Sequence, residues 1–206
     1  MKKAITISYL VLLSGCAPYV LVGGKYTAGP ENFEVDLPEG WKKHEMRFDN
    51  SPISRAMLQE LNKRRDPAGD VVRITRDGLL LQQIVIGRIL LDKEWPHTKR
   101  KLAKTMLPQE VAEVIIDNIH SNPNISNQNI LENSPAKLSG YAGVKIIYTY
   151  HTKESLRIKG AHYGTMVGDW YYYVLYEAPE RYYFAKDYRA FEQIKDTFRI
   201  LKAGAA

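Results

Sequence analysis

The sequence predicts an α+β fold in which helices flank a single antiparallel β-sheet. Three observations support this class. Several stretches alternate apolar and polar residues as half-buried strands do, short turn sequences separate them, and two amphipathic helices interrupt the series. The chain has 206 residues, of which 45% are hydrophobic. Since a chain of this length can bury a substantial core, we expect one domain rather than two small ones.

The chain begins with a short secretory signal. Two lysines precede an apolar run over residues 4–13, which is too short to cross a bilayer because a spanning helix needs about 20 apolar residues. The run ends in Leu13-Ser14-Gly15-Cys16, which resembles the lipobox of bacterial lipoproteins. The resemblance implies that residues 1–15 are removed as a lipoprotein signal peptide and that Cys16 becomes an acylated N-terminus.

An ordinary signal peptide with an incidental cysteine is the alternative. Cys16 is the only cysteine in the chain, and it stands at the one spacing at which lipidation needs a thiol. Two or three acyl chains such as palmitate anchor a protein stably, whereas one chain binds only marginally. Ala17 occupies the position where an aspartate would indicate inner-membrane retention. The resemblance therefore implies a membrane partner, contacted through acyl chains, and a location on the periplasmic face of the outer membrane.

The net charge argues against a nucleic-acid partner, and the cysteine content argues against a domain stabilised by disulfides. Removal of residues 1–15 takes away two lysines and no acidic residue, so the formal charge falls from +6 to +4. This modest excess, in a periplasmic protein, does not indicate a nucleic-acid partner. Acylation leaves no free thiol to form a disulfide, so burial of apolar side chains must stabilise the domain.

The domain is expected to follow a tether. Residues 16–29 contain Gly23-Gly24 and show no sustained period, so they are interpreted as the acylated cysteine and a flexible tether. The domain is assigned to residues 30–202, and residues 203–206 are assigned to a disordered tail.

The domain opens with strand patterns. Phe33–Leu37 alternates apolar and acidic residues, which predicts a half-buried strand that ends at Pro38-Glu39-Gly40. Residues 43–49 are a candidate second strand. Residues 51–69 have mixed signals and are interpreted as a short helix or an ordered loop.

A long hairpin follows. Residues 71–76 alternate, and Asp77-Gly78 is a dipeptide favoured in two-residue hairpin turns. Residues 79–91 are apolar on both faces, which is typical of a strand covered on both sides. We therefore expect the second strand of this hairpin at the centre of the sheet.

The second half of the chain begins and ends with a helix. Pro108 opens the first, whose apolar stripe includes Val111 and Ile115 and which ends at Asn122-Pro123. The last helix covers residues 188–197, with Asp187 as its expected N-cap. Strands are predicted between the two helices over residues 127–132, 141–151, 155–163 and 169–177.

Four landmarks follow one another along the chain: Phe33-x-Val-x-Leu-Pro-x-Gly-Trp41, Arg76-Asp77-Gly78, Gly140-Tyr141-x-Gly143 and a closing helix over residues 191–198. In this order they resemble bacterial envelope lipoproteins with a PsbP-like α/β/α sandwich domain. The resemblance spans residues 30–202. It implies the fold and, because most such proteins are described as binding or assembly modules, a non-enzymatic role. Fold alone does not settle function.

The sequence contains no recognisable catalytic or metal-binding set. No histidine pair has the spacing of a metalloprotease motif, no Cys/His cluster exists, and no Gly-x-Ser-x-Gly elbow occurs. The carboxylates of Asp77 and Asp169 are explained by turns. We therefore expect no metal, no cofactor and no enzymatic activity. The histidines are His44, His97, His120, His151 and His162.

Two groups of residues are candidates for an interaction surface. The basic run Lys99-Arg100-Lys101, with Lys104 nearby, is suited to anionic phospholipid headgroups, and a solvated face is the alternative. Tyrosines near the C-terminus form the second group, because tyrosine offers a large, stiff contact area with a polar tip. Tyr171 and Tyr182 are its candidates for contact with a partner.

The strand alternation limits the tyrosine hypothesis. It sends Tyr171 and Tyr173 to one face of the sheet and Tyr172 and Tyr176 to the other, so at least one pair must pack in the interior. Packing is therefore the alternative interpretation of this group.

These observations predict an outer-membrane-anchored periplasmic lipoprotein that acts as a non-enzymatic binding or assembly module with an envelope protein partner. A carrier or sensor of a small apolar or glycan ligand is the alternative, and an aromatic-lined cavity between sheet and helix would favour it. The third hypothesis is an envelope enzyme in which distant residues, for instance His162 and Asp169, converge. The sequence does not identify the partner or the oligomeric state.

Overall fold

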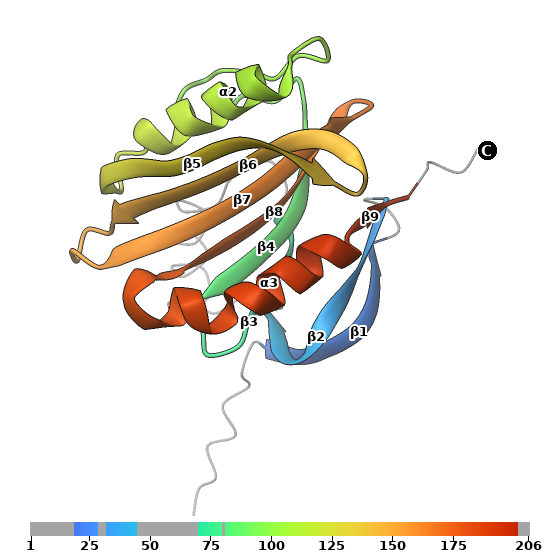
Figure 1. Ribbon diagram of the computed structural model, residues 1–206, viewed down its shortest axis with the longest axis vertical. Coiled ribbons are helices and arrows are strands. Elements are labelled where there is room, and N and C mark those ends of the chain that lie inside the picture. The colour runs from blue at the N-terminus through green and yellow to red at the C-terminus, as the bar shows by residue number, and fades with distance from the viewer. Residues whose placement is uncertain (1–18, 29–31, 45–69, 80, 202–206) are drawn as a thin grey trace, which may run out of the picture.

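The computed structural model describes residues 19–28, 32–44, 70–79 and 81–201. One sheet lies between two helices (Figure 1). None of the described helices is long and apolar enough to cross a membrane. In chain order the elements are β1 (Tyr19–Ala28), β2 (Phe33–His44), β3 (Asp70–Thr75), β4 (Gln83–Leu90), α2 (Pro108–His120), β5 (Ser126–Leu138), β6 (Tyr141–His151), β7 (Arg157–Val167), β8 (Trp170–Pro179), the π-helical segment η1 (Glu180–Phe184), α3 (Ala185–Thr197) and β9 (Arg199–Ile200).

The sheet is antiparallel and has the strand order β1-β2-β3-β4-β8-β7-β6-β5, with β9 added beside β2. Strand β4 lies between β3 and β8, and it is buried on both faces. The predicted class, a single antiparallel sheet with flanking helices, and the central position of this strand are confirmed.

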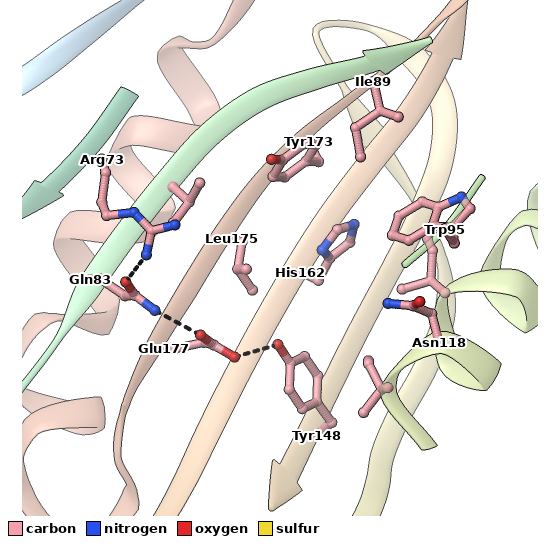
Figure 2. Close-up of a pocket in the computed structure, with 13 residues that line it drawn as sticks. Arg73, Gln83, Ile89, Trp95, Asn118, Tyr148, His162, Tyr173, Leu175 and Glu177 are labelled. Carbon is pink, nitrogen blue, oxygen red and sulfur yellow. Dashed lines mark hydrogen bonds between the residues drawn. The ribbon is translucent and has the colours of Figure 1, made fainter. Parts of the chain in front are cut away.

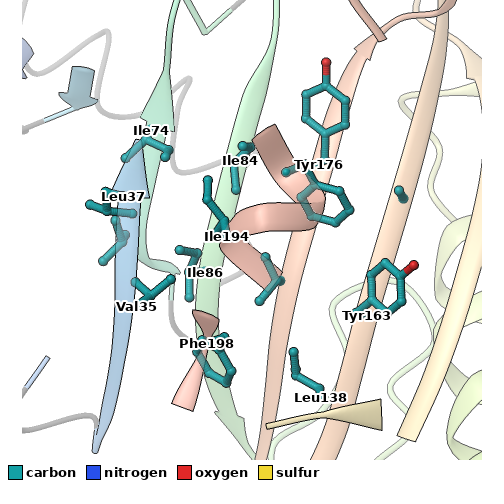
Figure 3. Close-up of a cluster of buried hydrophobic side chains, with 14 of the residues drawn as sticks. Val35, Leu37, Ile74, Ile84, Ile86, Leu138, Tyr163, Tyr176, Ile194 and Phe198 are labelled. Atoms are coloured by element: carbon teal, nitrogen blue, oxygen red, sulfur yellow. The ribbon is translucent and has the colours of Figure 1, made fainter. Parts of the chain in front are cut away.

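The two helices cover opposite faces of the sheet. Phe191 and Ile194 of α3 pack against Ile84, Ile86 and Tyr176, which project from β4 and β8 (Figure 3). Burial of side chains of this size contributes about 1.5–3 kcal/mol each. This face carries the larger of the two apolar cores.

The opposite face of the sheet carries α2. Val111, Val114 and Ile115 form the stripe that the helical period predicts, and they pack on the side of the sheet where Val144 and Ile146 of β6 project. The helix lies over β5 and β6, at one edge of the sheet (Figure 1). The predicted helix after Pro108 is thus confirmed.

Strand β8 distributes its tyrosines as the alternation predicts. Tyr171 and Tyr173 belong to the core beneath α2, whereas Tyr172 and Tyr176 belong to the core beneath α3. All four are buried. Both sets therefore serve packing.

The prediction of a flexible tether over residues 16–29 is wrong for residues 19–28, which form edge strand β1 along the whole of β2. Gly24 has a φ of 77° and stands where the register shifts between Val22 and Gly24, so it marks a β-bulge. The side chain of Ala28 is buried in the core beneath α3. The glycine pair that indicated a tether is a feature of the strand.

Strand β2 continues through Pro38-Glu39-Gly40 instead of ending there, and it includes residues 43 and 44 of the candidate second strand. Gly40 has a φ of 78°, which lets the chain bend without leaving the sheet. Residues 45–69 lie outside the described residues, as do the expected signal peptide, Cys16 and the tail.

The two-residue turn predicted at Asp77-Gly78 is wrong, because β3 ends at Thr75 and β4 begins at Gln83. The buried side chain of Gln82 organises the wider loop between them. Its Oε1 accepts hydrogen bonds from the backbone N–H groups of Arg76 at 2.9 Å and Asp77 at 3.1 Å. A side-chain amide thus satisfies the backbone groups that a tight turn would pair.

The last helix begins earlier than predicted, at Ala185, and follows the π-helical segment. Asp187 is not its N-cap. The carboxylate is buried in the first turn, where it accepts hydrogen bonds from Arg76 Nη1 at 3.0 Å and from Gln82 Nε2 at 2.9 Å. It joins α3 to the β3–β4 loop.

The remaining strands occur where predicted: β6 has the predicted ends, Tyr141–His151, whereas the ends of β5, β7 and β8 differ. Strand β5 continues to Leu138, six residues beyond the predicted end at residue 132. Its added part alternates exposed residues with residues that face the core, such as buried Leu138, and it contains Pro135, which is tolerated because β5 is an edge strand. Strand β7 covers Arg157–Val167 rather than residues 155–163.

Candidate functional site

A cavity of about 190 Å³ lies on the α2 face of the sheet (Figure 2). The helix lies over β5 and β6, so it does not cover the same face of β4 and β8. The space above these two strands is bounded by the loop that carries Trp95 and by the side of α2 that faces it. The alternation of β4 and β8 aims every second side chain into this space. The apolar part of the wall consists of Val85, Ile89, Ile115, Ile119 and Leu175.

One end of the cavity carries a chain of hydrogen bonds that joins residues of four strands, β3, β4, β8 and β6 (Figure 2). Arg73 Nη1 donates to Gln83 Oε1, and Gln83 Nε2 donates to Glu177 Oε2 at 2.9 Å. The hydroxyls of Tyr148 and Tyr150 donate to Glu177 Oε1 at 2.9 and 3.3 Å. The negative charge of Glu177 and the positive charge of Arg73 are thus joined through one amide, and this end carries no net charge.

The two tyrosines at this end remain protonated. Burial raises the pKa of Tyr148 well above its usual value, and the charge of Glu177 raises it further. Burial, followed by the same carboxylate, also raises the pKa of Tyr150. Both hydroxyls therefore act as donors that fix the orientation of Glu177, and they are not candidates for an ionised base.

Three mutually adjacent aromatic rings form the floor beside this network. The ring of His162 lies nearly parallel to those of Tyr171 and Tyr173, at centroid distances of 5.9 and 5.7 Å. The centroids of the two tyrosine rings are 6.2 Å apart, so the three rings form a triangle. His162 Nε2 shares a hydrogen bond of 2.6 Å with the Tyr171 hydroxyl. Burial lowers the pKa of His162 to about 4, so the imidazole is neutral at neutral pH.

Two glycines in β7 make room for this floor. Gly160 and Gly164 stand two residues on either side of His162, on the same face of the sheet. The ring of Tyr148 lies over the first and that of Tyr171 over the second, where side chains would otherwise project. The spacing Gly-x-His-x-Gly is the local sequence signal for this arrangement.

Two polar groups beside the cavity keep unused donors. Asn118 Oδ1 accepts from the His97 backbone N–H at 3.0 Å, but its Nδ2 has no hydrogen bond among the described residues and points into the cavity (Figure 2). Trp95 Nε1 is buried and likewise has no partner within the part of the chain that the structure describes. Asn118 Nδ2 is the donor that a bound molecule would meet.

The arrangement favours binding over acid–base chemistry. Glu177 already accepts three hydrogen bonds, and the neutral His162 is engaged with Tyr171 rather than with a nucleophile. His162 and Asp169 do not converge, because Asp169 lies in the β7–β8 turn and forms an ion pair with Lys104. Within the described residues no group of three or more His, Cys, Asp or Glu side chains is placed to hold a metal.

The structure separates the residues that were expected to form an interaction surface. Tyr171 is fully buried, so its assignment to an exposed surface is wrong, whereas Tyr182 is 63% exposed. Lys99, Arg100 and Lys101 are all exposed. Their run is less basic than its sequence indicates, since Arg100 pairs with Asp117.

The basic run also has a structural role. The backbone N–H of Trp95 donates to the carbonyl of Arg100 at 2.8 Å, and that of Lys99 donates to the carbonyl of Trp95 at 2.9 Å. This small loop holds Trp95 beside the cavity, where its ring meets Tyr171 edge-on at a centroid distance of 6.1 Å.

No protein-family model matches this chain, and no curated protein sequence matches it. Its fold is nevertheless shared by solved structures. The solution structure of cyanobacterial PsbP (CyanoP) from Synechocystis matches with a TM-score of 0.54 at 12% identity, over 91% of this chain and 98% of that protein. LpqN of Mycobacterium tuberculosis, described as involved in cell envelope biogenesis, matches with a TM-score of 0.51 at 11% identity, over 89% and 91%.

A Bacteroides thetaiotaomicron protein also matches, with a TM-score of 0.50 at 12% identity. The match covers 88% of this chain but only 50% of that protein, so the chain spans about half its length. At these identities the comparisons show the fold alone, and that fold is PsbP-like.

Proposed function

We propose that this protein is a non-enzymatic binding module of the bacterial cell envelope that takes a small neutral ring compound into the cavity beneath α2. The cavity itself carries the proposal, because it combines an aromatic floor, an apolar wall and one polar end. Sites for small molecules in proteins are mostly apolar with a few well-placed polar groups.

The size of the cavity limits its ligand. An engineered apolar cavity of about 150 Å³ accepts benzene, so a cavity of about 190 Å³ accommodates one ring with a few substituents and not a long acyl chain. The flat rings of His162 and Tyr173 suit the face of a sugar or an aromatic ring.

The polar groups determine the charge of the ligand. Arg73 and Glu177 already compensate each other, and a further buried charge without a partner would be strongly disfavoured. The free Nδ2 of Asn118 calls for an acceptor on the ligand. A neutral ring with a hydroxyl or carbonyl oxygen on one edge meets both requirements.

The envelope location is part of the proposal. It is supported by the signal sequence and by Leu13-Ser14-Gly15-Cys16, which place a lone cysteine where lipoproteins are acylated. Two acyl chains at Cys16 would hold the domain on a membrane, and Ala17 favours the periplasmic face of the outer membrane.

The test is a thermal-shift screen of the purified protein against neutral monosaccharides and single-ring aromatic compounds, with dissociation constants of the hits measured by calorimetry. Leu175→Trp, which fills the cavity, should abolish binding, while Leu131→Trp on exposed β5 should leave it unchanged. Asn118→Ala should weaken binding roughly three- to tenfold, as expected for one lost hydrogen bond. Hits that bind Leu175→Trp as tightly as the wild type would contradict the proposal.

An assembly module with an envelope protein partner is the second candidate, and the exposure of Tyr182 favours it. This ring stands edge-on to Tyr183 at a centroid distance of 5.1 Å and is 63% exposed. In-cell cross-linking should then capture one reproducible envelope protein that Tyr182→Ala loses and that Tyr141→Ala, a change at another exposed tyrosine, retains.

A further inference from the structure

The start of β1 exposes apolar side chains at the corner of the sheet. Leu21 is 72% exposed and Val20 is 44% exposed, and Leu21 is the most exposed large hydrophobic side chain among the described residues. Strand β1 is an edge strand (Figure 1), and neither side chain belongs to an apolar core. Adjacent exposed apolar residues at a sheet edge call for an explanation.

This corner lies close in the chain to the proposed acylation point. Only Ala17 and Pro18 separate Cys16 from Tyr19. A fully extended chain spans at most about 3.6 Å per residue, so the Cα atom of Tyr19 lies within roughly 11 Å of that of Cys16 and the Cα atom of Leu21 within roughly 18 Å. These distances are comparable to the depth of the headgroup layer and its boundary with the acyl chains.

The neighbouring strand adds positive charge at the same corner. In the register of β1 and β2, Leu21 stands opposite Lys42 and Val20 opposite Lys43. Lys42 is exposed and has no ion-pair partner among the described residues. The ammonium of Lys43 lies 5.3 Å from the centre of the Tyr26 ring. Lysines beside exposed apolar residues suit the interface of an anionic bilayer.

We infer that this corner, formed by Tyr19–Leu21 with Lys42 and Lys43, rests on the bilayer that holds the acyl chains of Cys16. The inference rests on the lipid anchor of the proposed function. Leu21 enters the boundary between headgroups and acyl chains, while the lysines contact anionic headgroups. Exposed Glu39 in the nearby bend reduces the local positive charge, so the apolar contact and the anchor provide most of the attachment.

The inference fixes the orientation of the domain, and labelling at single positions tests it. Because Cys16 is the only cysteine and acylation consumes its thiol, Leu21→Cys supplies the only reactive thiol of the lipidated protein. The matched control is Leu131→Cys, an exposed leucine on β5 at the opposite edge of the sheet. Each lipidated variant is labelled with an environment-sensitive fluorophore and reconstituted into phosphatidylethanolamine–phosphatidylglycerol vesicles that contain a nitroxide-lipid quencher.

We expect quenching at position 21 to be at least severalfold stronger than at position 131, and Lys42→Glu to reduce it at position 21 alone. Equal quenching at the two positions, in protein whose acylation is verified by mass spectrometry, would overturn the orientation while leaving the anchor intact. Absence of any lipid on Cys16 would overturn both the anchor and this inference. The proposal of a ligand in the cavity does not depend on this outcome, because the ligand screen tests it separately.

Discussion

At the scale of single residues, two glycines in β7 determine how aromatic rings lie beside the cavity. A Cβ atom at Gly160 would stand 2.4 Å from Tyr148 Cζ, and one at Gly164 would stand 1.8 Å from the hydroxyl oxygen of Tyr171. Ordinary contacts between such atoms are about 3.5–4.0 Å. Each ring therefore occupies space that any larger residue would need.

Gly164→Ala should displace Tyr171 and break its hydrogen bond to His162. Because overpacking of a core costs about 1–3 kcal/mol, the free energy of unfolding in urea should fall by this amount. The control is Gly23→Ala in edge strand β1, where the nearest atom to a new Cβ is the flexible Glu39 side chain at 3.3 Å. Equal losses from the two variants would show that the ring position does not depend on this glycine.

The buried histidine makes stability depend on pH. Burial lowers the pKa of His162 to about 4 in the folded state, against 6.5 for an unperturbed histidine. Between these values the unfolded chain binds the extra proton, so the stability due to this residue is complete above pH 6.5 and is lost as pH falls toward 4. The loss amounts to up to about 3 kcal/mol.

Urea unfolding of the wild type and of His162→Gln between pH 4 and pH 7 measures this contribution. The variant has no group that titrates at this position, so its stability should fall less steeply below pH 6.5. Carboxylates contribute equally to both proteins, and the difference between the two curves isolates the histidine. If stability depended on pH in the same way in both proteins, the pKa of His162 would not be lowered in the folded protein.

At the scale of elements, one buried side chain joins the β3–β4 loop to α3. The Oε1 atom of Gln82 accepts from two loop N–H groups, and its Nε2 donates to the Asp187 carboxylate at 2.9 Å. Arg76 Nη1 donates to the other oxygen of the same carboxylate at 3.0 Å. The loop and the first turn of the helix are therefore stabilised together.

Gln82→Ala should destabilise the protein by about 1–3 kcal/mol, because buried polar groups lose their partners. The backbone amides of Arg76 and Asp77 should lose protection from hydrogen exchange at the same time. Gln193→Ala on the exposed side of α3 serves as the control and should change neither quantity. Retained protection of both loop amides in Gln82→Ala would contradict this role.

The elements show where sequence reasoning succeeds and where it fails. Long periodic stretches such as α2 and β8 are predicted because one periodicity decides which residues are buried. Strand β1 is missed because the glycine pair Gly23-Gly24, which lies at its bulge, is also typical of a flexible tether. The loop after Thr75 is missed because a distant side chain, Asp187, supplies part of its hydrogen bonding.

The candidate site is less predictable from the sequence than the fold. The facing direction of Tyr171 and Tyr173 follows from strand alternation, and an aromatic-lined cavity was one of the expected alternatives. The polar end was not expected, because Gln83 and Glu177 are 94 residues apart and meet only through the pairing of β4 with β8. Pairing between strands distant in sequence cannot be derived from the local pattern of either.

At the scale of the whole molecule, the proposed anchor and the cavity depend on different parts of the chain. The lipidation signal lies within residues 13–16, whereas the cavity is lined by β3, β4, β6, β7, β8, α2 and the loop before α2. No residue that lines the cavity comes from β1. Location and ligand binding should therefore be separable by mutation.

Cys16→Ser should separate them. Without the thiol no diacylglycerol can be attached, so the variant should keep its signal or be released in soluble form, and radiolabelled palmitate should no longer enter it. Its ligand affinity in the calorimetric assay should equal that of the wild type, because the cavity is unchanged. Palmitate incorporation into Cys16→Ser would show that another residue carries the lipid, and a loss of affinity would show that the anchor and the cavity are coupled.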